Sequence, residues 1–277
     1  MCEFCTQHGE GKKWYLNVKN YAAELLNDPK RRSMIKNFYK EVVDQGNNNI
    51  TRLEKMFQRD PKLLERIREA YTQEMKSMHF GQILPLEEVA KVVSICNTAV
   101  RLPCGCRWAY NKQEARVCFG ISFGMPDWFS ELDMDFFGSP DVAQFDHLDR
   151  EQVIAIIKEL DKQGMVHSIW TFQTPFIGAI CNCELKSCLA MRSTVGLQMP
   201  LMFKSEEIAK IDTEKCTGCQ ECLHTCQFNA IEYVEADNRS QINPKSCFGC
   251  GVCRESCPEE AIHLVERRTH PVASSIW

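Results

Sequence analysis

The sequence lacks the long apolar runs that membrane-spanning helices require, since no stretch approaches the roughly 18 to 20 consecutive apolar residues needed. Its first residues, "MCEFCTQHGEGKKWY", contain no apolar core of a secretory signal. The chain also has little excess charge, with a formal net charge of −4. Neither nucleic acid nor a membrane is therefore expected as a partner.

Several catalytic motifs are missing as well. There is no G-x-x-x-x-G-K-[ST] loop, because "HGEGKKW" spaces its glycines too closely and lacks the hydroxyl residue. No G-x-G-x-x-G follows a strand-like run, and neither C-x3-C-x2-C nor G-x-S-x-G occurs. The sequence gives no support to ATP, dinucleotide, radical-SAM or serine-hydrolase chemistry, and it assigns no catalytic residue.

Cysteine is the residue that this chain has in excess, with 17 among 277 residues. Thiols inside cells stay reduced, so a high cysteine count there points to metal binding or catalysis rather than to disulfides. Free thiols are also easily oxidised in air. We therefore expect a cytoplasmic protein of an anaerobic or microaerobic cell.

Two segments near the C-terminus repeat one cysteine pattern. "KCTGCQECLHTCQFNAIEYV" and "SCFGCGVCRESCPEEAIHLV" align at a constant offset of 31 residues, for example Cys216 with Cys247 and Val234 with Val265. Each contains C-x2-C-x2-C-x3-C. Zinc ribbons and buried thiols are alternatives for isolated cysteine pairs, but a duplicated four-cysteine motif favours an iron–sulfur site.

This repeat resembles the bacterial two-cluster ferredoxins. In that family each run supplies three thiolates to one [4Fe–4S] cluster, and its fourth cysteine binds the other cluster. The resemblance implies two ligand sets: Cys216, Cys219, Cys222 and Cys257 for one cluster, and Cys247, Cys250, Cys253 and Cys226 for the second. Gly218 and Gly249 would allow positive φ in the cluster loops. One departure is Gln227, which follows Cys226 where Pro258 follows Cys257.

Most of the remaining cysteines form short upstream groups: Cys104, Cys106 and Cys118, then Cys181, Cys183 and Cys188. Each C-x-C pair follows an apolar, strand-like run. Residues i and i+2 of an extended chain point to the same side, so each pair can present two thiolates together. We interpret these cysteines as ligands of one or two further [4Fe–4S] or other metal centres, and prefer one shared centre. A zinc site or unliganded buried thiols are the alternatives.

Four other features are less decisive. Cys2 and Cys5 form a C-x2-C that either binds a metal and ties down the terminus or is incidental. Cys96 lies on the apolar face of a predicted helix and is expected in the core. Arg107 either donates hydrogen bonds to a cluster or anionic ligand, or lies on the surface. Four aromatic residues either wall a substrate pocket or pack in the core: Phe123, Trp128, Phe136 and Phe137.

The hydrophobic pattern predicts an α+β protein with three parts. Residues 1–100 are predicted to form a helical N-terminal region with the C-x-x-C at its terminus. Residues 101–205 form a central cysteine-bearing domain, and residues 206–277 the dicluster ferredoxin domain and tail. Within the central part, "DREQVIAIIKELDKQG" is typical of an amphipathic helix, and "MVHSIW" and "FIGAICN" are typical of strands. This order resembles the end of a winged-helix unit.

Residues 100–265 as a whole resemble multi-cluster iron–sulfur proteins of anaerobic bacteria and archaea, through "PCGCR", "GMVH", "ICNC" and the ferredoxin repeat. In that family "CNC" is often followed directly by more cysteines, whereas here the next is Cys188. The resemblance implies low-potential electron transfer to a redox partner protein or complex. The alternative is an iron–sulfur reductase with a substrate-accessible cluster in the central domain. A winged-helix regulator is disfavoured because residues 149–162 are nearly neutral.

Overall fold

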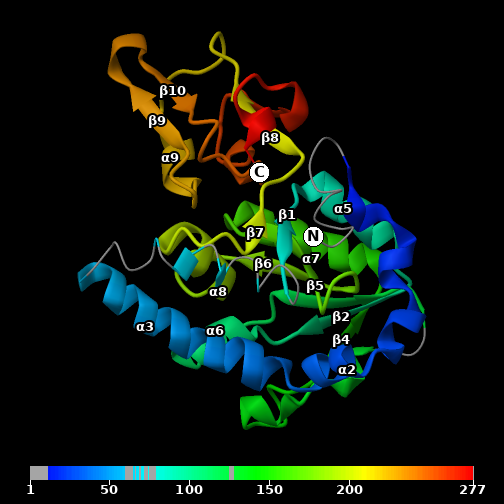
Figure 1. The fold of residues 1–277 in the computed structure, drawn as a ribbon. Helices are drawn as coiled ribbons and strands as arrows, with labels where there is room; N and C mark the ends of the chain where they lie inside the picture. The colour runs from blue at the N-terminus through cyan, green and yellow to red at the C-terminus, as the bar shows by residue number, and fades with distance from the viewer. Residues whose placement is uncertain are drawn as a thin grey trace.

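The computed structural model describes residues 12–59, 65, 67–68, 70–71, 74, 79–124 and 128–276 of the chain. A mixed sheet covered by helices on both faces forms the larger part, and the ferredoxin repeat forms a lobe beside it (Figure 1). Helices and sheets occur together throughout, so the predicted α+β class is confirmed. Cys2 and Cys5 lie outside the described residues.

The central sheet has seven strands in the order β4-β2-β3-β6-β5-β1-β7. Neighbouring strands are antiparallel except for β1 and β7, which are parallel. The strands are β1 Gly81–Ile83, β2 Thr98–Leu102, β3 Cys118–Ser122, β4 Asp146–Leu148, β5 Val166–Thr171, β6 Ile177–Cys183 and β7 Met202–Phe203.

One face of this sheet is covered by α5 (Leu86–Ile95), α7 (Arg150–Lys162) and the short helices η1 (Trp14–Leu16) and η2 (Val18–Tyr21). Helix α7 begins at a capping box, in which Asp149 accepts from the Gln152 backbone N–H and Gln152 accepts from that of Asp149. Its apolar stripe is buried against α5. Cys96, directly after α5, is buried in this layer as predicted.

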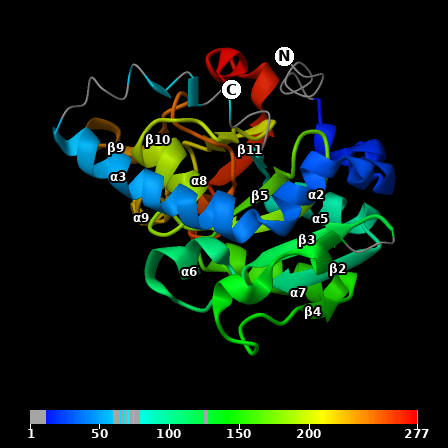
Figure 2. The same ribbon diagram turned by 60° about the horizontal axis from the view of Figure 1, so that its bottom comes forward.

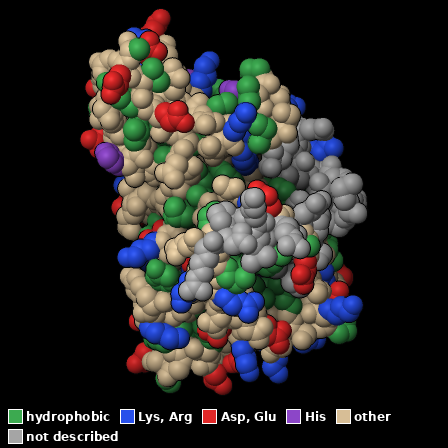
Figure 3. All heavy atoms as spheres, turned by 60° about the vertical axis from the view of Figure 1, so that its left-hand side comes forward, with side chains coloured by type: hydrophobic (Ala, Val, Ile, Leu, Met, Phe, Trp, Pro, Cys, Tyr) green, Lys and Arg blue, Asp and Glu red, His purple; other side chains and the backbone are tan. Residues whose placement is uncertain are grey.

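The other face lies under a second helical layer, whose long helices α2 and α3 cross in front of the sheet in Figure 2. Tyr39 and Val43 of this layer are buried in the core. The helices are η3 Ala23–Asn27, α2 Pro29–Lys36, η4 Phe38–Asp44, α3 Gln45–Arg59, α6 Gly105–Asn111, η5 Trp128–Glu131, η6 Met134–Phe137, α8 Leu189–Met191 and η7 Arg192–Gly196. On the side seen in Figure 3, basic and acidic side chains are interspersed, which is typical of a solvated surface.

The ferredoxin lobe contains two small antiparallel ribbons, β8 with β11 and β9 with β10. The two halves of the repeat contribute equivalent hairpin strands, β9 and β11, after their fourth cysteines. The elements are β8 Glu207–Ile211, α9 Glu221–Thr225, β9 Ile231–Val234, η8 Glu235–Asp237, β10 Arg239–Ile242, η9 Val252–Arg254, β11 Ile262–Glu266, η10 Arg267–Thr269 and η11 Ala273–Ser275.

The predicted helix–strand–turn–strand unit is present as α7, β5 and β6, and β5 pairs with β6. It is part of the seven-stranded sheet, however, and not of the small sheet of a winged-helix unit. The predicted boundary at residue 100 falls inside β2, and β1 and α5 also belong to the central layers. Strand pairings between distant segments depend on tertiary packing, which local periodicity does not encode.

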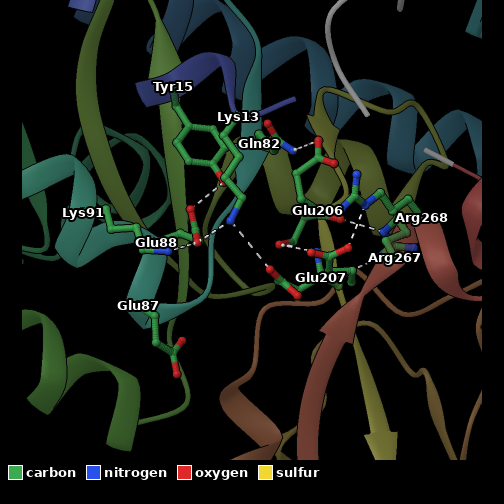
Figure 4. Close-up of polar contacts among 12 residues, drawn as sticks. Lys13, Tyr15, Gln82, Glu87, Glu88, Lys91, Glu206, Glu207, Arg267 and Arg268 are labelled. Atoms are coloured by element: carbon green, nitrogen blue, oxygen red, sulfur yellow. Dashed lines mark hydrogen bonds and ion pairs between the residues drawn. The ribbon is translucent and has the colours of Figure 1, made fainter. Parts of the chain in front are cut away.

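A polar network joins the ferredoxin lobe to the central sheet (Figure 4). Lys13 Nζ lies 2.6 Å from Glu88 Oε1 and 3.8 Å from Glu207 Oε1 at the start of the lobe. Tyr15 Oη donates to Glu88 Oε2 at 3.0 Å. Gln82, in strand β1 of the seven-stranded sheet, donates to the Lys204 carbonyl at 3.0 Å. The N-terminal segment, the sheet and the lobe are therefore joined by polar side chains, some of them buried and some partly exposed.

Candidate metal centres

The eight cysteines of the ferredoxin repeat surround two separate hollows. Each hollow takes three cysteines from one half of the repeat and the fourth cysteine from the other half. One hollow is lined by Cys216, Cys219, Cys222 and Cys257. The other is lined by Cys247, Cys250, Cys253 and Cys226. The structure thus brings together the two sets that the ferredoxin resemblance implies, and their role as ligands stays a prediction.

Backbone geometry around both hollows suits sulfur ligands. The Ala230 N–H points to Cys226 Sγ at 3.4 Å, and the equivalent Ala261 N–H points to Cys257 Sγ at 3.3 Å. Such N–H···S contacts tune the potential of iron–sulfur clusters. Gly249 has φ +72°, and a Cβ added there would lie 1.9 Å from the Glu207 carbonyl oxygen. Glycine is therefore required at this turn, as the loop spacing predicts.

Burial in the second hollow favours the protonated form of Cys250 and Cys253 in the absence of metal. It raises the pKa of Cys250 to about 12, and it also raises the pKa of Cys253. Thiolates coordinated to iron would offset this desolvation cost, and metal binding would release their protons. Four cysteines around each hollow are the donor set of a [4Fe–4S] cluster, so these residues fit the implied cofactor.

The upstream cysteines also converge, although they come from four different elements. Cys104 precedes α6 and Cys106 lies in its first turn, whereas Cys118 begins β3. Cys181 and Cys183 lie on β6, where Cys181 pairs with Cys118 across the sheet. Together with Cys188, which precedes α8, all six line one cavity, which we call the central cavity.

The six thiols form a continuous series of neighbours, which we call the central thiol ring. Its order is Cys181, Cys118, Cys104, Cys106, Cys188 and Cys183. The thiols of Cys106 and Cys118 hold the pKa of Cys104 well below its ordinary value. The same interaction with Cys104 raises the pKa of Cys106 well above its ordinary value. Six thiols in one such series are more than the four that one cubane binds.

Arg107 lies beside this ring and is buried, with only 5% of its surface exposed. The surface alternative for this residue is therefore wrong. Its Nε donates to Glu184 Oε1 at 3.0 Å, and Glu184 also accepts from Ser187 Oγ at 2.8 Å. The guanidinium contributes to the low pKa of Cys104, because a nearby positive charge favours a thiolate. Arg107 can thus offset negative charge on the central thiol ring.

A buried polar chain connects the ring to helix α7. Asn182, which lies between Cys181 and Cys183, donates to the Val117 carbonyl at 2.6 Å. Its Oδ1 lies 2.6 Å from His167 Nδ1, and His167 Nε2 lies 3.2 Å from Asp161 Oδ1. These side chains are almost inaccessible to water. They hold the cysteine-bearing end of β6 in one position against α7.

Gln227 connects the ferredoxin lobe to the same end of β6. Its Oε1 accepts from the Leu185 N–H at 2.6 Å, and its Nε2 donates to the carbonyls of Gly164 and Cys183. Sequence reasoning identified Gln227 only as a departure from the proline of the sister repeat. That departure was the one sequence signal for this contact. The glutamine side chain has an amide group that can both donate and accept hydrogen bonds, whereas the proline side chain at the equivalent position can do neither.

Two roles were predicted for four aromatic residues: lining a pocket or packing in the core. The structure shows both roles. Trp128 lines the central cavity. Phe136 stacks on Tyr39 with ring centroids 5.5 Å apart, and Phe137 packs edge-on against the same ring. Phe123 contacts Tyr21 under the opposite layer.

Within the described part of the chain, no three His, Cys, Asp or Glu side chains are arranged to hold a single metal ion.

Comparison with known proteins identifies the C-terminal lobe. Residues 209–264 match the family model of the 4Fe-4S dicluster domain, and this range includes all eight repeat cysteines. Comparisons with curated proteins and with solved structures found no match. Among the helices that the structure describes, none has the length and apolar character to span a bilayer. A 4Fe-4S dicluster ferredoxin domain indicates iron–sulfur electron transfer with a redox partner.

Proposed function

We propose that this protein carries low-potential electrons through two ferredoxin [4Fe–4S] clusters to one central metal centre held by the central thiol ring. The ring supports this proposal because six cysteines from α6, β3, β6 and α8 surround a single cavity. Bound [4Fe–4S] clusters supply one-electron redox chemistry. The chain itself positions the thiolates, excludes water and provides Arg107 as a buried counter-charge.

The contact between Gln227 and β6 carries the proposal. Cys226 belongs to the cysteine set of the second ferredoxin hollow, and Gln227 is its neighbour in the chain. The Gln227 amide donates to the carbonyl of Cys183, which is a member of the central thiol ring, at 3.5 Å. One residue and one hydrogen bond therefore separate a ferredoxin cysteine from a ring cysteine. Such a short connection suits electron exchange between the two sites.

A second set of contacts connects the same two sites. The carboxylate of Asp161 is near enough to Cys250 to contribute to the raised pKa of that thiol, after the larger effect of burial. Asp161 also contacts His167, which contacts Asn182 between two ring cysteines. Arg254, next to Cys253, forms an ion pair with Glu87 of α5 at 2.6 Å. The second hollow is thus the part of the lobe that faces the central domain.

Gln227→Leu tests the role of this contact. The leucine keeps the size of the side chain but cannot make the hydrogen bonds to Leu185 and Cys183, each worth about 1 kcal/mol. We expect several-fold slower electron transfer from the reduced ferredoxin clusters to the central centre, with unchanged iron content. Rapid-freeze EPR after mixing with a low-potential donor measures this rate.

Gln241→Leu is the matched control, because Gln241 is exposed on β10 and lies away from the central domain. It should transfer electrons at the wild-type rate. If Gln227→Leu also transfers at that rate, the Gln227 contact is not the route between the two sites. If zinc at about one equivalent occupies the central ring, the centre is not redox-active and the proposed function is wrong.

A further inference from the structure

The central cavity is much larger than either ferredoxin hollow. Its volume is about 110 Å³, whereas the hollows lined by the two ferredoxin cysteine sets have volumes of about 10 and 20 Å³. The two hollows give an internal scale for the space that four cysteines leave around a [4Fe–4S] cluster. A centre that fits a hollow of that size would therefore leave part of the central cavity free.

The part of the cavity beyond the thiols is lined mainly by apolar side chains. They come from both the sheet and the helical layer above it: Phe38, Trp128, Leu132, Trp170, Phe172 and Ala179. The aromatic rings pack on one another, with centroids 4.7 Å apart for Trp128 and Phe172 and 4.9 Å for Phe38 and Phe172. These contacts hold the aromatic lining in a fixed shape.

Several polar side chains along the cavity already have partners. Arg107 and Ser187 bind Glu184, and Asn182 binds Val117 and contacts His167. His79 stacks on Trp170, its Nδ1 donates to the Thr171 carbonyl, and burial lowers its pKa to about 4. At neutral pH this imidazole is therefore uncharged. A charged ligand would lose its hydration here without gaining an equivalent partner.

We propose that the apolar part of the central cavity binds a small, uncharged molecule of about the size of one aromatic ring, next to the central metal centre. Apolar cavities on the order of 150 Å³ stay dry and bind ligands of benzene size, so a cavity of about 110 Å³ that also borders the metal centre limits the ligand to about one ring. The position next to the centre rests on the proposed function. The ligand site itself rests on the volume and the lining.

Titration of the anaerobically purified, iron-loaded protein with toluene tests this site. Trp128 and Trp170 line the cavity, so we expect a saturable change in tryptophan fluorescence. We also expect a shift in the EPR signal of the central centre and unchanged ferredoxin signals. Benzoate should bind at least about tenfold more weakly, because its carboxylate must be desolvated. A non-saturable response, or equal affinity for benzoate, would overturn the proposal.

A pair of alanine variants locates the ligand. Ala179→Leu adds volume within the cavity and should weaken toluene binding by at least about tenfold. Ala99→Leu adds the same volume to a buried position in β2 on the opposite side of the sheet, and should leave the affinity unchanged. Wild-type affinity in Ala179→Leu would contradict the assignment of the ligand to this cavity.

Val43→Ala provides an independent test in case Ala179→Leu fails to fold. It enlarges the cavity from the η4 side and should raise the affinity for naphthalene by at least about tenfold. An unchanged affinity would count against the site. Iron analysis separates the two proposals. If toluene binds but the protein holds no iron beyond the ferredoxin clusters, only the central metal centre is overturned. If the protein holds the full iron content but does not bind toluene, only the ligand site is overturned.

Discussion

Replacing Cys106 by alanine is expected to remove the central metal centre and leave both ferredoxin clusters in place. Cys106 lies in the middle of the central thiol ring, between Cys104 and Cys188. It does not line either ferredoxin hollow. Two [4Fe–4S] clusters account for about eight irons per chain, so the iron content should fall from about twelve or more to about eight.

Iron and sulfide analysis of anaerobically purified protein measures this change, and EPR after dithionite reduction shows which signals remain. Cys96→Ala is the matched control, because Cys96 is buried outside the central cavity and burial raises its pKa to about 12. It should retain all of the iron. Wild-type iron content in Cys106→Ala would show that this thiol is not required. A wild-type protein with only about eight irons would refute the central iron centre altogether.

Replacing Arg267 by methionine is expected to cause the largest loss of stability. Arg267 is fully buried and donates to three backbone carbonyls, those of Ser205, Glu207 and Cys247, at 2.6, 3.0 and 3.0 Å. Methionine fills the space but leaves these acceptors without their donor, and each such loss costs about 1–3 kcal/mol. We expect the free energy of unfolding to fall by at least about 3 kcal/mol.

The same substitution should weaken iron retention by the second ferredoxin cluster, because Arg267 holds the backbone of Cys247. Denaturant unfolding followed by circular dichroism measures stability, and iron release to a chelator measures retention. Arg268→Met is the control, since Arg268 is exposed and pairs only with the exposed Glu266 among the contacts described. Equal stability of the two variants would show that the buried guanidinium is dispensable.

The sequence was most informative where the chemistry is set by short spacing along the chain. For the repeat from Cys216 to Cys257, the resemblance to two-cluster ferredoxins predicted which four cysteines meet at each hollow, and the short gaps predicted the tight turns. Gly249 illustrates this, since its positive φ and its close approach to Glu207 are properties of one tight loop. The amphipathic helix over residues 150–162 and the buried position of Cys96 were likewise local properties of the chain.

The tertiary structure alone decided how distant segments meet. Cys104 and Cys188 are both in the central thiol ring because β2, β3 and β6 are neighbours in one sheet, an order that no local pattern specifies. Arg107 is buried because Glu184, far along the chain, provides its partner. Gln227 reaches Cys183 because the lobe packs on β6. The sequence by itself thus determined which cysteines form closely spaced groups. The assembly of the upstream groups around one cavity depends on long-range packing and on hydrogen bonds that form only in the folded chain.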